Sequence, residues 1–66
     1  MKRELNLREQ KAMDYLLRHG KITNMEYREL NPEIKKSAAF NELKDLVDKG
    51  LISLNGKGRY AHYVLS

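Results

Sequence analysis

The chain has 66 residues, and its 13 Lys and Arg against 9 Asp and Glu give a formal net charge of +4. It contains no cysteine, so disulfide scaffolds, thiolate metal sites and thiol catalysis are excluded. No apolar run approaches the roughly 20 residues of a transmembrane helix, and the charged start Met1–Glu4 is unlike a signal peptide. A chain this small has a thin core and cannot also enclose a large cofactor. We therefore expect a soluble, cytoplasmic binding module with no cofactor, and not an enzyme.

The first helix is predicted at residues 6–19. Asn6 suits the N-cap, and Glu9 three residues later completes a capping box. Apolar residues then recur at the spacing of one helix face, and Gly20 suits the left-handed position that ends a helix.

The second helix is predicted at residues 24–30. Thr23 and Glu26 form another capping box, and Pro32 disfavours helical geometry in the residue before it. Ile22, between the two helices, can add a single short strand.

The third helix is predicted at residues 33–48. Asn31 suits its N-cap and Pro32 its first position. Gly50 fits the position after the last turn, where Leu51 can fold back onto the helix.

A β-hairpin is predicted after the third helix, with strands at 51–54 and 60–65. Asn55-Gly56 is a strong short-range hairpin signal. The connecting loop carries Lys57 and Arg59, and the C-terminal quarter of the chain contains no acidic residue. Such a segment favours a polyanionic partner, although modest basicity also serves solubility alone.

Three helices followed by a basic hairpin is the element order of a winged helix-turn-helix, an α+β fold. No linker, repeat or low-complexity stretch marks a second domain. We therefore predict a single winged-helix domain over residues 1–66.

Four segments also carry a likeness to a known family: His19-Gly20-Lys21-Ile22-Thr23-Asn24, Glu26-Tyr27-Arg28-Glu29-Leu30, Leu43-Lys44-Asp45-Leu46-Val47-Asp48-Lys49-Gly50-Leu51-Ile52, and Gly56-Lys57-Gly58-Arg59 ahead of Tyr63. On these segments, residues 7–65 resemble the C-terminal winged helix of bacterial RecG-like putative ATP-dependent helicases. Similar domains occur in Fic-type proteins and transcriptional regulators. The resemblance implies that the third helix is the recognition helix and that the loop at 56–59 is the wing. It also implies a DNA-binding terminal module of a larger helicase-related or transcription-regulating protein.

The sequence departs from the family pattern at the recognition helix. The preceding turn, Asn31-Pro32-Glu33, is one residue longer, and the helix opens Lys35-Lys36-Ser37-Ala38 where the family has a Ser-Arg-Arg-Thr-like start. Asn41 stands where the family often has arginine, and Phe40 where it often has a small hydroxyl residue. The recognition surface is therefore less basic than the family pattern.

The candidate DNA-binding residues lie on the polar face of the third helix and in the wing: Lys35, Lys36, Ser37, Asn41, Lys44, Lys57 and Arg59. Asn41 can bond bidentately to adenine, and the cations can hold phosphates. The alternative to DNA binding is an ordinary solvated helix face, which Glu42, Asp45 and Asp48 on the same helix favour.

The remaining polar and aromatic residues do not form a catalytic or metal site in the sequence. His19 and His62 fall in separate elements without converging partners, so we expect structural roles for them. Tyr27 and Tyr63 are expected to close the core with their hydroxyls in water. Phe40 is either half-buried or part of an exposed apolar patch.

Double-stranded DNA is the partner that the sequence favours. The alternative is a protein-interaction or self-association module with no DNA binding of its own, which the acidic half of the third helix and Phe40 favour. The rest of a parent protein or a homodimer partner fits that alternative. No membrane partner and no small-molecule substrate is expected.

Overall fold

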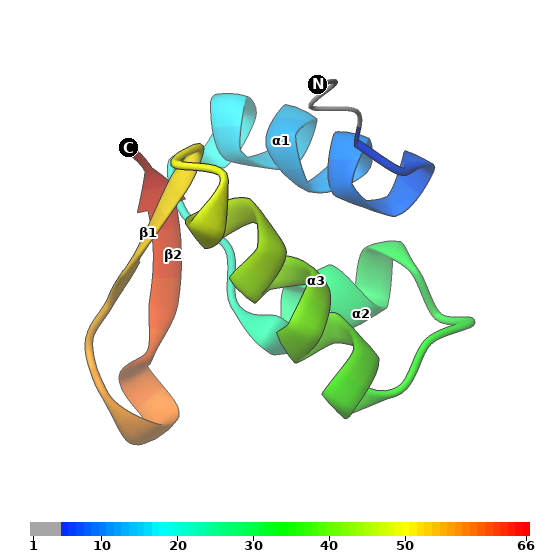
Figure 1. The fold of residues 1–66 in the computed structure, drawn as a ribbon. Coiled ribbons are helices and arrows are strands. Elements are labelled where there is room, and N and C mark those ends of the chain that lie inside the picture. Colours follow the sequence, from blue (N-terminus) through cyan, green and yellow to red (C-terminus); the bar gives the residue numbers. More distant parts are fainter. Residues whose placement is uncertain (1–4) are drawn as a thin grey trace.

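The computed structural model describes residues 5–66. Three helices precede a two-stranded antiparallel hairpin with a 3-10 turn at its tip (Figure 1). The elements are α1 (Leu7–His19), α2 (Asn24–Leu30), α3 (Lys36–Asp48), β1 (Ile52–Asn55), η1 (Gly58–Tyr60) and β2 (His62–Leu65). The predicted α+β layout of a winged helix-turn-helix is confirmed.

Both predicted capping boxes are present, and they set the starts of α1 and α2. The Asn6 side chain accepts a hydrogen bond from the Glu9 N–H at 2.7 Å, and the Glu9 carboxylate accepts one from the Asn6 N–H at 3.1 Å. Thr23 and Glu26 exchange the equivalent bonds at 3.1 and 2.9 Å. Each box satisfies two backbone donors that the first turn would leave unpaired.

The predicted start of α3 at residue 33 is wrong by three residues. Asn31 caps the end of α2, because its backbone N–H and its side-chain amide both donate to the Tyr27 carbonyl, at 3.1 and 3.0 Å. Asn31 is fully buried in this role and cannot also cap α3. The chain then turns through Ile34, and Lys35 becomes the N-cap of α3 without a side-chain hydrogen bond.

The end of α3 follows the sequence prediction. Gly50 has a φ of 77°, and its N–H donates to the Val47 carbonyl at 2.9 Å. The Leu51 N–H donates to the Leu46 carbonyl at 3.1 Å. These two bonds form a Schellman motif, which turns the chain from α3 directly into β1.

The hairpin is shorter than predicted because its tip forms a 3-10 turn. Ile52 pairs with Leu65 and Asn55 with His62, so β1 begins and ends one residue later than expected, and β2 begins two residues later. In the turn, the Tyr60 N–H donates to the Lys57 carbonyl at 3.0 Å.

Gly56 is required at the start of this tip. Its φ is 78°, and a Cβ atom there would lie 2.6 Å from the Tyr60 carbonyl oxygen. Gly58 also has a positive φ, of 56°, but a Cβ atom added there would have no other atom of the described residues within 4 Å, apart from the neighbouring residues. The tip therefore needs Gly56 both for its dihedral angle and for the close approach of the two backbone segments.

A backbone bridge joins the hairpin to the segment between α1 and α2. The Ile22 N–H donates to the Tyr63 carbonyl at 2.9 Å, and the Tyr63 N–H donates to the Ile22 carbonyl at 2.8 Å. The predicted short strand at Ile22 is thus confirmed as a single bridge. It fixes the hairpin against the helices.

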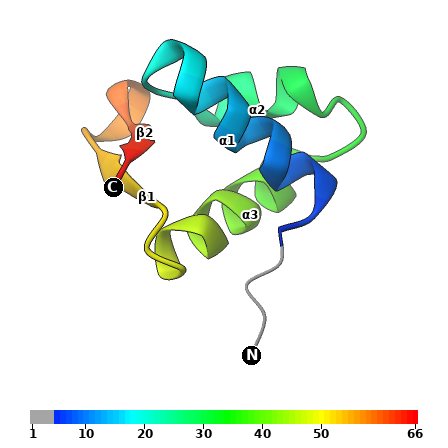
Figure 2. The ribbon, with the colours of Figure 1, turned by 90° about the horizontal axis from the view of Figure 1, so that it is seen from above.

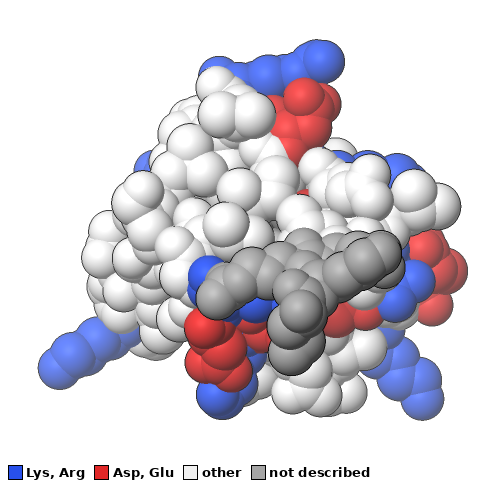
Figure 3. Space-filling view, turned by 45° about the horizontal axis from the view of Figure 1, so that its top comes forward, with Lys and Arg blue, Asp and Glu red and all other residues white. Residues whose placement is uncertain are grey.

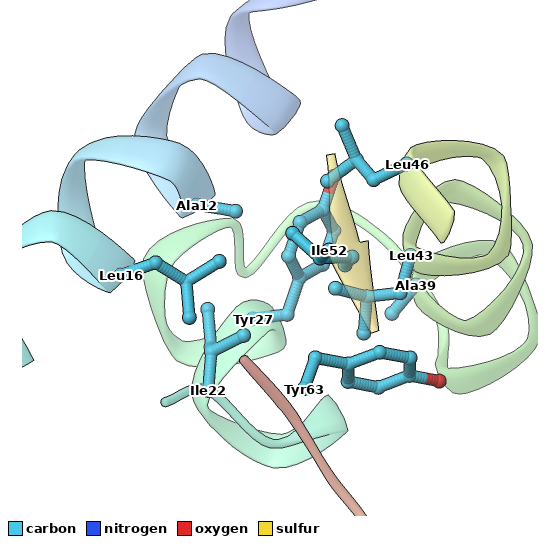
Figure 4. Packing of buried hydrophobic residues seen from close by; sticks show 9 residues of the cluster. All are labelled: Ala12, Leu16, Ile22, Tyr27, Ala39, Leu43, Leu46, Ile52 and Tyr63. Atoms are coloured by element: carbon cyan, nitrogen blue, oxygen red, sulfur yellow. The ribbon is translucent and has the colours of Figure 1, made fainter. Parts of the chain in front are cut away.

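The core draws on all three helices and both strands (Figure 4). In the view from above, the three helices and the hairpin are arranged around one common interior (Figure 2). Its buried members are Ala12, Leu16, Ile22, Tyr27, Ala39, Leu43, Leu46, Ile52 and Tyr63. Tyr27 is fully buried, and its hydroxyl donates to the Glu42 carboxylate. The expectation that this hydroxyl faces water is wrong, because it bonds to Glu42 of α3, which also forms an ion pair with Arg8 of α1.

Candidate nucleic-acid interface

A groove with a volume of about 930 Å³ opens between α2, α3 and the hairpin. The start of α3 and the tip of the hairpin lie on the same side of the molecule, away from α1 (Figure 1). We call this feature the α3–wing groove; its lining residues are Thr23, Asn24, Met25, Arg28, Lys36, Ser37, Phe40, Asn41, Leu54, Gly58, Arg59, Ala61 and Tyr63.

The structure brings four of the seven candidate residues together in this groove: Lys36, Ser37, Asn41 and Arg59. The other three are exposed but do not line it. Lys35 lies just before α3 and Lys57 just before the wing turn, so both flank the groove. Lys44 lies one turn further along α3, where its Nζ contacts Asp48 at 3.4 Å.

The groove is cationic. Arg28, Lys36 and Arg59 line it, and none of the acidic residues in the described range 5–66 does. Within residues 5–66, none of these three cations forms an ion pair. Their charges are therefore available to a ligand, and the low-dielectric walls strengthen their combined field.

Arg28 and Asn24 were missed by the sequence analysis. The Arg28 Nε–H donates to the Asn24 side-chain oxygen at 2.8 Å, and the Asn24 side-chain amide donates to the Lys36 carbonyl at 3.3 Å. One asparagine thus orients a groove arginine and joins the first turns of α2 and α3. The four-residue spacing of Asn24 and Arg28 placed them on one helix face, which was the available signal.

The acidic residues of α3 do not line the groove. Glu42 accepts hydrogen bonds from the Arg8 Nε–H at 3.0 Å and from the Tyr27 hydroxyl. The Arg8 guanidinium and the Tyr27 hydroxyl hold the pKa of Glu42 below its usual value, against the opposing effect of burial. Glu42 therefore carries its charge inside a contact between α1 and α3, so it does not support the alternative interpretation of α3 as a solvated face.

The other two acids of α3 are also paired. Asp45 contacts the Lys49 Nζ at 2.9 Å, which lowers the pKa of Asp45, and Asp48 contacts Lys44. Lys49 lies 3.9 Å from Glu9, whose pKa is raised by burial. On the face shown in Figure 3, acidic and basic side chains adjoin one another. The acidic half of α3 is thus compensated within the fold and leaves the groove positive.

Three exposed apolar side chains are part of the groove lining, and together we call them its apolar floor. Met25, Phe40 and Leu54 remain 62, 52 and 51% exposed although all three line the same groove. Phe40 is therefore exposed, as in the second of its two sequence alternatives, an exposed apolar patch. The groove lining thus combines three cations with hydrocarbon that a ligand can cover.

Each histidine contacts a residue close to it in the sequence. The His19 ring lies over Tyr15 with a centroid separation of 4.3 Å, and His62 Nδ1 contacts the Tyr60 carbonyl oxygen at 2.9 Å. Among residues 5–66, no group of three or more His, Asp or Glu is placed to hold a metal ion. No helix in that range is long and apolar enough to cross a membrane.

Comparison with known proteins adds no family to this description. No protein-family model matches the chain, and no curated protein matches it. A function for the chain has to be argued from the chemistry of the α3–wing groove.

Proposed function

We propose that the chain binds double-stranded DNA in the α3–wing groove. The observation that carries the proposal is the groove itself, because in the part of the chain that the structure describes three cations line it and no acidic residue does. Duplex DNA is a polyanion whose phosphates are bound through such cations. The resemblance to RecG-like C-terminal domains supports a role as the terminal module of a larger, cytoplasmic helicase-related or transcription-regulating protein.

The groove suits the docking mode of helix-turn-helix proteins. In that mode, the N-terminal half of the recognition helix contacts base edges in the major groove. Ser37 and Asn41 lie in that half of α3 and line the groove. Lys36 and Arg28 then reach phosphates beside the helix, while Arg59 and the flanking Lys57 reach the backbone beside the wing.

A salt titration of duplex binding tests the proposal. If four or five of Arg28, Lys35, Lys36, Lys57 and Arg59 each neutralise one phosphate, log K against log[salt] has a slope of about −3.6 to −4.5. Fluorescence anisotropy with a labelled mixed-sequence duplex measures this slope. No binding to any duplex at about 50 mM salt would overturn the proposal, since electrostatic attraction is strong under that condition.

Self-association is a second candidate function. It is favoured by one observation, the convergence of exposed Met25, Phe40 and Leu54 in a single groove. If two copies meet through this apolar floor, the wild-type chain is a dimer in light scattering and Phe40→Ser is a monomer. A monomeric wild-type chain at all accessible concentrations would exclude this candidate.

A further inference from the structure

The exposed stripe of α3 presents two adjacent residues of different chemistry. Lys36, Ser37, Phe40 and Asn41 follow the i, i+1, i+4, i+5 spacing of one helix face, and all four line the α3–wing groove. Phe40 and Asn41 are the members closest to the middle of the helix. Both are exposed, so both are available to a duplex lying in the groove.

Phosphate binding does not account for an apolar floor. Phosphates are bound by cations and by polar donors, and Arg28, Lys36 and Arg59 supply the cations in the groove lining. Phe40 instead places hydrocarbon on the same stretch of α3 as Ser37 and Asn41, with Met25 and Leu54 lining the same groove. On the major-groove edge of DNA, the apolar group is the 5-methyl group of thymine, and phenylalanine is among the residues that contact it.

Asn41 supplies a complementary polar contact. Its carboxamide carries one acceptor and two donors, which matches the N6 amino group and N7 of adenine in a bidentate arrangement. Among residues 5–66, no hydrogen bond or ion pair of the Asn41 side chain is present. Asn41 is therefore not needed to hold the fold together.

We propose that the α3–wing groove reads A·T base pairs in the major groove, with Phe40 on the thymine 5-methyl group and Asn41 on adenine. This inference rests on the proposed binding of duplex DNA and adds the bases that it prefers. An A·T pair presents the methyl group and the neighbouring N6 donor and N7 acceptor on its major-groove edge, whereas a G·C pair keeps an N7 acceptor but lacks the methyl group and has the O6 acceptor in place of the N6 donor. The apolar floor and the amide thus select the same base pair.

Base analogues test the two contacts separately. The probes are labelled duplexes of alternating A·T sequence, the same duplex with every thymine replaced by deoxyuridine, and the same duplex with every adenine replaced by 7-deazaadenine. Loss of one methyl contact is expected to weaken binding of the deoxyuridine duplex about fourfold. Loss of the N7 acceptor is expected to weaken binding of the deazaadenine duplex about fivefold or more.

Variants assign each effect to its residue. Phe40→Ala should bind the thymine and deoxyuridine duplexes equally, and Asn41→Ala should lose its sensitivity to deazaadenine, with the salt slope unchanged in both. Leu17→Ala is the matched control, because Leu17 is 72% exposed on α1 and outside the groove; it should keep both preferences. Thermal unfolding of each variant verifies that it is folded.

The outcomes separate this inference from the function on which it rests. Absence of binding to every duplex overturns both. Salt-dependent binding with equal affinity for the thymine and deoxyuridine duplexes overturns the role of Phe40 alone, and insensitivity to deazaadenine overturns that of Asn41. If Phe40→Ala changes the oligomeric state and leaves thymine discrimination intact, the apolar floor serves self-association and the inference fails.

Discussion

The Arg8 guanidinium in the first turn of α1 holds the Glu42 carboxylate in the middle of α3, with its Nε 3.0 Å from each carboxylate oxygen. The two residues are 34 positions apart in the sequence. The Tyr27 hydroxyl from α2 donates to the same carboxylate. One acidic side chain therefore joins all three helices, and it does so on the far side of α3 from the groove residues.

Removing this carboxylate should destabilise the fold. Glu42→Ala leaves the buried Tyr27 hydroxyl without its acceptor, so we expect a loss of about 1–3 kcal/mol in the free energy of unfolding. Urea denaturation followed by circular dichroism measures it. Asp48→Ala is the control, because its pair with Lys44 is exposed and should contribute less than about 0.5 kcal/mol. Equal losses in the two variants would mean that the buried contact has no special weight.

The same contact predicts a pH dependence. The pKa of Glu42 is lowered in the folded state, so the stabilisation from its charge is complete above the usual carboxyl pKa of about 4.5. This stabilisation is lost as the pH falls through the lowered pKa. Glu42→Gln cannot titrate, so the difference in unfolding free energy between wild type and this variant should shrink as the pH falls below about 4.5.

Glu9 acts in the opposite direction. Burial raises its pKa, so its protonation favours the folded state. Because Glu9 is present in both proteins, its effect largely cancels when they are compared. Urea titrations at several pH values provide the measurement, and a constant difference over that range would contradict the role of Glu42.

The two wing glycines should respond differently to alanine. Gly56→Ala forces a positive φ on an L-residue and places a Cβ atom 2.6 Å from the Tyr60 carbonyl oxygen, so a cost above about 2 kcal/mol is expected. Gly58→Ala meets open space and should cost about 1–2 kcal/mol from its dihedral angle alone. Urea denaturation of the pair measures the gap. A larger loss for Gly58→Ala would mean that the close approach of Gly56 to the Tyr60 carbonyl is not the main constraint on the tip.

Substitution of one lysine inside the groove and of one outside it tests whether DNA binding is confined to the groove. Lys36 lines the α3–wing groove, whereas Lys11 lies on α1 outside it. Lys36→Ala should weaken duplex binding for all sequences and reduce the steepness of the salt slope by about 0.9, as expected for one lost phosphate contact. Lys11→Ala should leave the slope unchanged. Equal effects would indicate diffuse attraction to the whole cationic surface.

The sequence was a good guide wherever the signal is local. A capping box spans four consecutive residues, so Thr23 and Glu26 predicted the start of α2 correctly. Asn31 was assigned to the wrong helix because its residue type suits either a helix start or a helix end. The choice depends on Ile34, which packs against the core and turns the chain before α3 begins.

The candidate site shows the same difference between local signals and contacts of residues that are far apart in the sequence. Helical spacing placed Lys36, Ser37 and Asn41 on one face, and the structure brings all three into the groove. The fate of Glu42 was not predictable, because its partner Arg8 comes from a distant part of the sequence. In the sequence, the acidic half of α3 therefore counts against DNA binding. In the structure, each of its acidic side chains is paired with a cation.

The bridge between Ile22 and Tyr63 has a consequence for the thermodynamics of binding. It fastens the wing to the segment before α2, while β1 follows α3 directly through a Schellman motif. Both walls of the α3–wing groove are thus held by backbone hydrogen bonds before any ligand arrives. A partner that fits this spacing does not have to order the wing, so little of its binding free energy is lost to conformational entropy.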